Sequence, residues 1–344
     1  MRVLIDTSYA GRGPSGTGVY VEQLVRALRE RGEVELVEAA QPRRLRPGAG
    51  NPACSAANAL LDLHWLHRGL AAAARRARAD VVHHPLPAYS RGVRCAQVAT
   101  FHDVVFEEMP QGYGRIWRAL AARAYRRAAS TCEAIVCVSA HTAADVTALL
   151  GAEPSKVVVA AHGPGQVEGI APPRCERVHL LYVGDAQERK HVGLLLEAYA
   201  AYRRSAADPA GLVLAGAAAG AAASSQSGVR GVPRPSREEL LALYGSAIAL
   251  VHPSAHEGFG LTVLEALVLG TPVVAVRNAA TEELAGAAAL LVTGAAQMAE
   301  AIGRLAADAD LREELSREGR QSAARFSWDG SARAHEQAYT LATR

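Results

Sequence analysis

The sequence lacks any apolar run of the ~20 residues that a membrane-spanning helix needs. The nearest candidate, residues 261–276, is interrupted by Glu265, Gly270 and Pro272. The first residues reach Asp6 too soon for a secretory signal peptide. We therefore expect a protein without a transmembrane segment that works in the cytoplasm.

Cysteine and net charge are also low. Five cysteines occur in 344 residues, with no Cys-x-x-Cys spacing, which favours free thiols in a reducing compartment. Net charge is only +3, from 37 basic and 34 acidic residues, so nucleic acid is not expected as a partner. No cluster of metal ligands is visible either, and we expect no metal. Half of the residues are hydrophobic, and the length allows two domains.

The most informative stretch lies between two apolar runs, residues 247–251 and 272–276. Residues 261–269 between them have the pattern of a helix, so the unit predicted is strand, loop, helix, strand, as in a parallel α/β sheet. The loop 257–260 lies where a strand ends and a helix begins, which is where such sheets bind ligands. Helix N–H groups there attract phosphate, and Gly258 and Gly260 permit its close approach.

Two glutamates flank this loop. Glu257 precedes it and Glu265 lies inside the helix. Carboxylates accept hydrogen bonds from sugar or ribose hydroxyls, so this spacing suits a ligand with a diphosphate between two sugar rings. Thr262 and Glu265 also fit a capping box, in which Glu265 would be purely structural. From these residues alone, both interpretations remain open.

The run Glu257-Gly-Phe-Gly-Leu-Thr-Val-Leu-Glu265-Ala, followed by Gly270-Thr-Pro-Val-Val, resembles the Glu-x7-Glu motif of retaining glycosyltransferases of family 4, also called group 1. Thr262 replaces a common proline; proline favours the first helical position, which argues against the capping box. The resemblance implies a GT-B fold, an α/β architecture with two Rossmann-like domains facing a cleft. It implies that Glu257 holds the donor sugar and Glu265 the ribose, while other donor contacts come from Gly258, Phe259, Gly260, Leu261 and Thr262.

Other segments extend the resemblance. Gly16 and Gly18, before a helix expected at 19–31, resemble the glycine loop of the N-terminal domain. His102, at the end of a strand at 98–101, resembles the family histidine that approaches the donor sugar. The spacing Gly11-x-Gly13-x-x-Gly16 formally matches a dinucleotide fingerprint, which is a weak signal by itself.

A basic pair starts the second half. A strand at 179–183 is followed by Gly184, which we group with the donor-binding residues, and by Arg189-Lys190 before a helix at 192–204. Cations are disfavoured at a helix N-terminus, and a bound diphosphate would compensate. In the family, an arginine and a lysine here neutralise the leaving diphosphate.

The resemblance gives domains at 1–168, for the acceptor, and 174–327, for the nucleotide-sugar, with a final helix at about 328–344 packing on the first. Residues 42–52 are expected to form an exposed loop. After a strand at 212–215, the Ala-Gly-Ser-rich stretch 216–228 departs from the family, which has a helix and a further strand there. We expect that strand to be missing.

The function implied is retaining transfer of a sugar from a UDP- or GDP-sugar to a hydroxyl, without metal or cofactor. His102, Arg189, Lys190 and Glu257 would be the catalytic residues. A small polar or glycan acceptor is favoured over a lipid-linked one, because no amphipathic basic helix stands out. The alternatives are a non-catalytic protein that binds sugar nucleotides and a nicotinamide-dependent oxidoreductase built on the first glycine loop.

Overall fold

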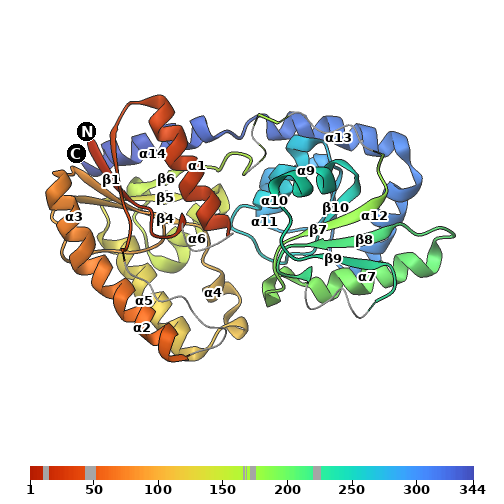
Figure 1. The fold of residues 1–344 in the computed structure, drawn as a ribbon, viewed down its shortest axis with the longest axis horizontal. Helices are drawn as coiled ribbons and strands as arrows, with labels where there is room; N and C mark the ends of the chain where they lie inside the picture. Colours follow the sequence, from red (N-terminus) through yellow and green to blue (C-terminus); the bar gives the residue numbers. More distant parts are fainter. Residues whose placement is uncertain (11–14, 43–51, 166, 168, 171–175, 220–225) are drawn as a thin grey trace. The chain divides into compact units, whose positions relative to one another are not determined.

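The computed structural model describes the chain except residues 11–14, 43–51, 166, 168, 171–175 and 220–225. The chain forms two compact units (Figure 1). Unit 1 consists of residues 1–161 and 328–344, and unit 2 of residues 162–327. The sequence places the corresponding limits at 168 and 174. Each unit is a six-stranded parallel sheet with helices.

Unit 1 has the strand order β2-β1-β3-β4-β5-β6. Its strands are β1 (Arg2–Asp6), β2 (Glu35–Ala39), β3 (Val81–His84), β4 (Ala96–Phe101), β5 (Ala134–Cys137) and β6 (Val157–Val159). Its helices are α1 (Gly16–Arg31), α2 (Pro52–His64), α3 (Leu70–Ala77), α4 (Val105–Glu108), α5 (Arg115–Thr131), α6 (Ala140–Leu150) and α14 (Trp328–Ala342). A π-helical turn, Trp65–Gly69, joins α2 to α3.

Unit 2 has the strand order β12-β11-β10-β7-β8-β9. Its strands are β7 (His179–Val183), β8 (Gly211–Ala215), β9 (Val229–Val232), β10 (Ala247–His252), β11 (Val273–Val276) and β12 (Leu290–Val292). Its helices are α7 (Val192–Ser205), α9 (Arg237–Gly245), α10 (Leu261–Leu269), α11 (Ala279–Leu284), α12 (Ala295–Ala307) and α13 (Ala309–Ala323).

The strand order shows where the chain stops adding strands on one side of the sheet and begins to add them on the other. In unit 2 the chain adds β8 and β9 on one side of β7, then returns to add β10, β11 and β12 on the other. In open α/β sheets, ligands bind beyond the carboxyl ends of the strands that flank this switch point. The segments that follow β7 and β10 therefore define where a ligand of unit 2 is expected.

Helix α10 has glycine at both ends for a conformational reason. Gly260 immediately precedes the helix at φ 95°, and Gly270 ends it at φ 71°, a left-handed conformation that side chains disfavour. Between them Val263, Leu264 and Leu267 are fully buried. The helix thus packs in the core, and its first turn lies at the carboxyl end of β10.

Several sequence expectations are confirmed in detail and others need correction. The strand at 179–183 and the helix at 261–269 have the expected bounds.

The expectation that the strand after residue 215 is missing was wrong, because β9 pairs with β8 at that sheet edge. The helix expected at 19–31 begins three residues earlier, because the Ser15 hydroxyl accepts a hydrogen bond from the Gly18 N–H at 3.1 Å. Gly11, Gly13 and the loop expected at 42–52 fall wholly or largely outside the described residues.

The final helix completes the core of unit 1, where the blue α14 lies beside the red α1 (Figure 1). His335 and Tyr339 of this helix are fully buried. The Tyr20 hydroxyl hydrogen-bonds to His335 Nε2 at 2.9 Å and to the Thr100 hydroxyl at 2.8 Å. The Tyr339 hydroxyl lies 2.9 Å from His83 Nδ1. A buried polar network therefore joins the last helix to α1, β3 and β4.

Candidate functional site

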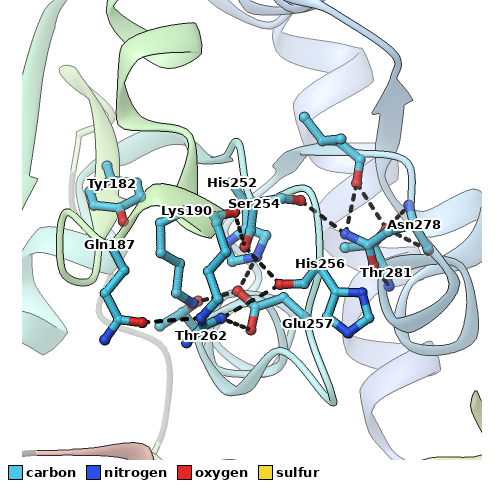
Figure 2. Close-up of polar contacts among 12 residues, drawn as sticks. Tyr182, Gln187, Lys190, His252, Ser254, His256, Glu257, Thr262, Asn278 and Thr281 are labelled. Atoms are coloured by element: carbon cyan, nitrogen blue, oxygen red, sulfur yellow. Dashed lines mark hydrogen bonds and ion pairs between the residues drawn. The ribbon is translucent and has the colours of Figure 1, made fainter. Parts of the chain in front are cut away.

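A carboxylate with three basic neighbours lies at the switch point of unit 2. Glu257 is buried in the loop after β10, and Figure 2 shows Lys190 and His252 pointing toward it. Lys190 Nζ forms an ion pair with Glu257 Oε1, and His252 Nε2 lies 3.3 Å from the same oxygen. Arg189 donates to Glu257 Oε2 at 3.2 Å. The structure therefore brings together three of the four residues that the sequence assigns to catalysis.

The charges in this cluster are strongly coupled. Burial alone raises the pKa of Glu257, but Lys190, His252 and Arg189 outweigh burial and hold that pKa well below its usual 4.5. Burial lowers the pKa of His252 from 6.5, although Glu257 opposes the shift. At neutral pH the cluster thus contains one carboxylate, two cations and a neutral imidazole, so it carries a net positive charge.

The backbone holds the two segments of the site together. Arg189 and Lys190 lie in a 3-10 turn, Glu188–Lys190, before α7. The Arg189 carbonyl accepts a hydrogen bond from the Ala255 N–H at 3.1 Å and another from the Ser254 hydroxyl at 3.3 Å. The Asn278 side chain in turn donates to the Ser254 carbonyl at 3.0 Å. The basic pair is therefore fixed to the loop that carries Glu257.

The loop 257–260 delivers the chain into α10. Phe259 is buried, with its ring edge-on to His162 at 5.0 Å and to Phe326 at 5.7 Å between centroids. Its side chain anchors the loop, next to Gly258. Leu261 and Thr262 form the first turn of α10 and are partly exposed. The first N–H groups of a helix have no partner within it, so this turn can donate to an anion.

Glu265 is not part of a capping box, so that interpretation was wrong. The residue before α10 is Gly260, which has no side chain to act as a cap. Glu265 Oε2 instead accepts a hydrogen bond from the Tyr244 hydroxyl at 2.9 Å. A Cβ atom on Gly165 would lie only 2.1 Å from Glu265 Oε1, so only glycine fits there. The surroundings of Glu265 hold its carboxylate in one orientation.

Gly184 follows β7 directly and packs closely on its neighbours. A Cβ atom there would lie 2.8 Å from the Tyr182 hydroxyl. That hydroxyl donates to the Asp185 carbonyl at 2.5 Å, which turns the chain toward the basic pair. Gly184 thus occupies the carboxyl end of one switch-point strand, while Glu257 follows the other.

Unit 1 holds the remaining predicted residues. Gly16 and Gly18 lie in the first turn of α1. His102 directly follows β4, and its ring lies edge-on to Tyr20 with centroids 4.8 Å apart. Its Nε2 lies 2.9 Å from the Pro85 carbonyl; because a carbonyl only accepts, Nε2 carries the proton and Nδ1 is the acceptor nitrogen of the neutral ring. Burial lowers the pKa of His102 from 6.5, so the neutral form is favoured.

Two residues of the site escaped the sequence analysis. His252 is the last residue of β10, and a polar residue that ends an apolar strand is a readable signal. Tyr244 lies near the end of α9 and has no such signal, because its contact with Glu265 depends on the packing of two helices.

A membrane span requires a helix of sufficient length and hydropathy, and none of the helices in the described part of the chain meets both requirements.

Two family models match different parts of the chain. Residues 14–163 match the model described as Glycosyltransferase Family 4, and residues 172–322 match Glycosyl transferases group 1. Together they cover most of both units. The second match contains the whole cluster around Glu257 and also Glu265.

Curated relatives and solved structures agree with these matches. A D-inositol 3-phosphate glycosyltransferase from Corynebacterium urealyticum is 44% identical over 107 residues, which are 29% of this chain and 24% of the relative. The chain spans about a quarter to a third of the length of the curated relatives it matches.

Solved structures of other proteins match nearly the whole chain. WaaG, a glycosyltransferase involved in lipopolysaccharide biosynthesis, has a TM-score of 0.69 at 19% identity, covering 98% of this chain and 99% of WaaG. HepE from Anabaena, solved in complex with UDP-glucose, has a TM-score of 0.69 at 14% identity, covering 98% and 99%. These likenesses, with the two parallel sheets, show the two-domain α/β GT-B fold.

Proposed function

We propose, since the chain belongs to the group 1, family 4 glycosyltransferases, that it transfers a sugar from a nucleotide-sugar donor to a hydroxyl of an acceptor. The observation that carries the proposal is the contact of Arg189 and Lys190 with the buried Glu257 at the switch point of unit 2. Two cations and the first turn of α10 suit a diphosphate, and the adjacent carboxylate suits sugar hydroxyls.

The residues divide the donor between them in this proposal. Arg189 and Lys190 hold the diphosphate and stabilise the charge that develops on it when the bond to the sugar breaks, which is electrostatic catalysis. Glu257 accepts hydrogen bonds from the transferred sugar. Glu265, oriented by Tyr244, accepts them from the ribose; a carboxylate has about four acceptor positions, so the tyrosine leaves it capacity.

We further propose retention of the anomeric configuration, without a metal. The acceptor oxygen attacks the anomeric carbon on the face that the diphosphate leaves, and a departing phosphate oxygen takes the acceptor proton. The guanidinium of Arg189 and the ammonium of Lys190 supply the positive charge that a divalent cation would otherwise supply. A chelator is expected to leave turnover unchanged.

The names of the relatives and of the similar structures indicate which donors and acceptors to test first. HepE is described in complex with UDP-glucose, so UDP-sugars are the first donors to test, followed by GDP-sugars. The curated relatives are named D-inositol 3-phosphate glycosyltransferases, so D-inositol 3-phosphate is the first acceptor to test. It belongs to the small polar class that the sequence favours.

The test begins with a thermal-shift screen of nucleotide-sugars, because a ligand that binds only the folded state raises the melting temperature. The stabilising donor is then incubated with acceptors, and proton NMR identifies the anomer formed first. An α-linked donor should give an α-glycoside. A β-glycoside would rule out retention, and donor hydrolysis or binding without transfer to any acceptor would favour the non-catalytic alternative.

A further inference from the structure

A pocket in unit 1 lies at the switch point of its sheet. The chain adds β2 on one side of β1 and then returns to add β3 and the later strands on the other side. Ligands of open α/β sheets bind beyond the carboxyl ends of the strands at such a position. Asp6, the last residue of β1, and His84, the last residue of β3, both line a pocket of about 330 Å³. This volume is at the lower end of the usual range for small-molecule sites.

An indole ring is fixed in one wall of this pocket. Trp65 Nε1 donates a hydrogen bond to Asp6 Oδ2 at 3.1 Å. Trp65 also begins the π-helical turn Trp65–Gly69, and a Cβ atom on Gly69 would lie only 2.3 Å from the indole. Only glycine therefore fits against this ring. π-Helical turns within helices are frequent at functional sites, and this one holds an aromatic ring in the lining of the pocket.

A neutral histidine contributes a hydrogen-bond acceptor to the lining. Gln97 Oε1 accepts from the Ser90 N–H at 2.8 Å, and the Gln97 amide nitrogen donates to the Ser90 carbonyl at 3.1 Å. The same Oε1 lies 3.0 Å from His84 Nε2, so Nε2 carries the proton and Nδ1 is the acceptor nitrogen. Burial lowers the pKa of His84 from 6.5. The ring is therefore neutral at pH 7 and adds no positive charge.

The charged groups that line the pocket are acidic. Asp6 and Asp62 belong to the lining, and its described residues include no lysine or arginine. Asp6 is 6% exposed and accepts hydrogen bonds at both oxygens, from the Ser8 N–H and from Trp65. An anionic ligand would be repelled by two carboxylates. An ammonium group would be attracted both to the carboxylates and to the face of the indole.

The pocket borders the candidate catalytic histidine of unit 1. Pro85 lines the pocket, and its carbonyl accepts the hydrogen bond from His102 Nε2 at 2.9 Å. His102 directly follows β4, which pairs in parallel with β3, so both groups lie at the carboxyl edge of the sheet. A ring bound in the pocket thus lies near the residue that the family resemblance places at the donor sugar.

We propose that this pocket binds the acceptor, and that the acceptor is a cyclic polyol with an ammonium group, an amino sugar or an amino cyclitol. The inference rests on the proposed function, which requires an acceptor in addition to the donor. Asp6 and Asp62 accept hydrogen bonds from the ammonium group and from hydroxyls, and the apolar face of the ring covers Trp65. The pocket supplies binding and orientation only. D-inositol 3-phosphate would bring a phosphate against two carboxylates and should bind here poorly.

Binding is measured on the full chain without donor, by saturation-transfer NMR and calorimetry. Three matched rings serve as probes: glucosamine, glucose and glucose 6-phosphate. Glucosamine should bind at least about tenfold more tightly than the other two, because its ammonium group makes charge-assisted hydrogen bonds. Added salt should weaken this binding. Equal binding of the three rings, tighter binding of glucose 6-phosphate, or no binding of glucosamine would overturn the proposal.

Substitutions with matched controls assign the binding to this pocket. Asp62→Asn should lower the affinity for glucosamine about tenfold and leave that for glucose nearly unchanged, because it removes only a charge. Trp65→Leu should lower both affinities, because both rings cover the indole. Glu30→Gln, at an exposed position of α1, and Trp117→Leu, at an exposed tryptophan of α5, should bind as the wild type does. Wild-type affinities in Asp62→Asn and Trp65→Leu, with native melting temperatures, would overturn the proposal.

Transfer assays separate this pocket from the proposed function. With a donor that stabilises the chain, glucosamine should be a better acceptor than glucose, and Asp62→Asn should raise its KM with little change in kcat. Transfer to glucosamine with an unchanged KM in Asp62→Asn would overturn the pocket as the acceptor site, while the proposed function would stand. Glucosamine binding that Asp62→Asn weakens, without transfer from any donor, would contradict the proposed function and still support the ligand class of the pocket.

Discussion

The Tyr244 hydroxyl donates a hydrogen bond to Glu265 across 2.9 Å, and both side chains are buried. The bond joins the end of α9 to the middle of α10. Burial, with Glu265 as a further cause, raises the pKa of Tyr244 well above 10. The tyrosine is thus a permanent donor that orients the carboxylate from a second helix.

The first prediction concerns the ribose role of Glu265. Glu265→Gln should weaken binding of both the intact donor and the bare nucleoside diphosphate, since a hydrogen bond to a charged group contributes about 1.5–3 kcal/mol. Tyr244→Phe should weaken the same affinities by a smaller factor, because it removes only the orienting bond. Calorimetry with UDP and GDP measures both. Wild-type affinity in Glu265→Gln would leave Glu265 with a structural role only.

The second prediction concerns the basic pair. Arg189→Ala and Lys190→Ala should each weaken diphosphate binding about tenfold or more, because each removes a charge-assisted contact. Arg204→Ala, an exposed arginine at the other end of α7, is the matched control and should bind normally. If all three variants bind alike, Arg189 and Lys190 serve only to neutralise Glu257.

The third prediction separates Glu257 from the diphosphate site. Glu257→Gln should lower turnover by about tenfold or more, while affinity for the bare nucleoside diphosphate does not fall, because Arg189 and Lys190 remain. Glu282→Gln is the control: Glu282 forms an exposed ion pair with Arg277 at 2.6 Å. Loss of diphosphate affinity in Glu257→Gln would contradict the division of the donor proposed above.

The fourth prediction is a loss of stability in acid. Burial lowers the pKa of His335 from 6.5 to about 4, and that of His83 well below 6.5. Between pH 6.5 and about 4, the unfolded chain binds protons at these histidines that the folded chain does not. The free energy of unfolding therefore falls as the pH falls. His335 alone contributes a loss of about 3 kcal/mol between pH 6.5 and about 4.

Urea unfolding across that pH range measures the loss. His335→Gln should reduce the slope of the unfolding free energy against pH by the amount that corresponds to about one proton, since glutamine does not titrate. An unaltered slope in His335→Gln would mean that other groups dominate the acid response.

The sequence predicts local elements where periodicity and end signals coincide. Helix α10 has the bounds expected because apolar residues fill it and glycines flank it. Strand β9 was missed because it is four residues long, lies at a sheet edge and contains Arg230 and Gly231. The edge strand β2, with two glutamates in five residues, is equally hard to recognise.

Part of the candidate site could likewise be predicted from the sequence, and part of it could not. The sequence locates Glu257 and the basic pair because these residues lie in the segments that follow predicted strands. The contact between them, the neutral His252 and the Tyr244 bond depend on tertiary packing, which no spacing in the sequence expresses.

Unit 1 is assembled from two segments far apart in the sequence, since α14 supplies the buried His335 and Tyr339 to a unit begun by β1. During synthesis, residues 162–327 leave the ribosome before the residues of α14 do. The sequence of unit 2 is therefore complete before the sequence of unit 1. The nascent N-terminal unit meanwhile exposes the surface that α14 will cover. Unit 1 is therefore begun before unit 2 but completed after it, unlike the usual order in which the domain begun first also folds first.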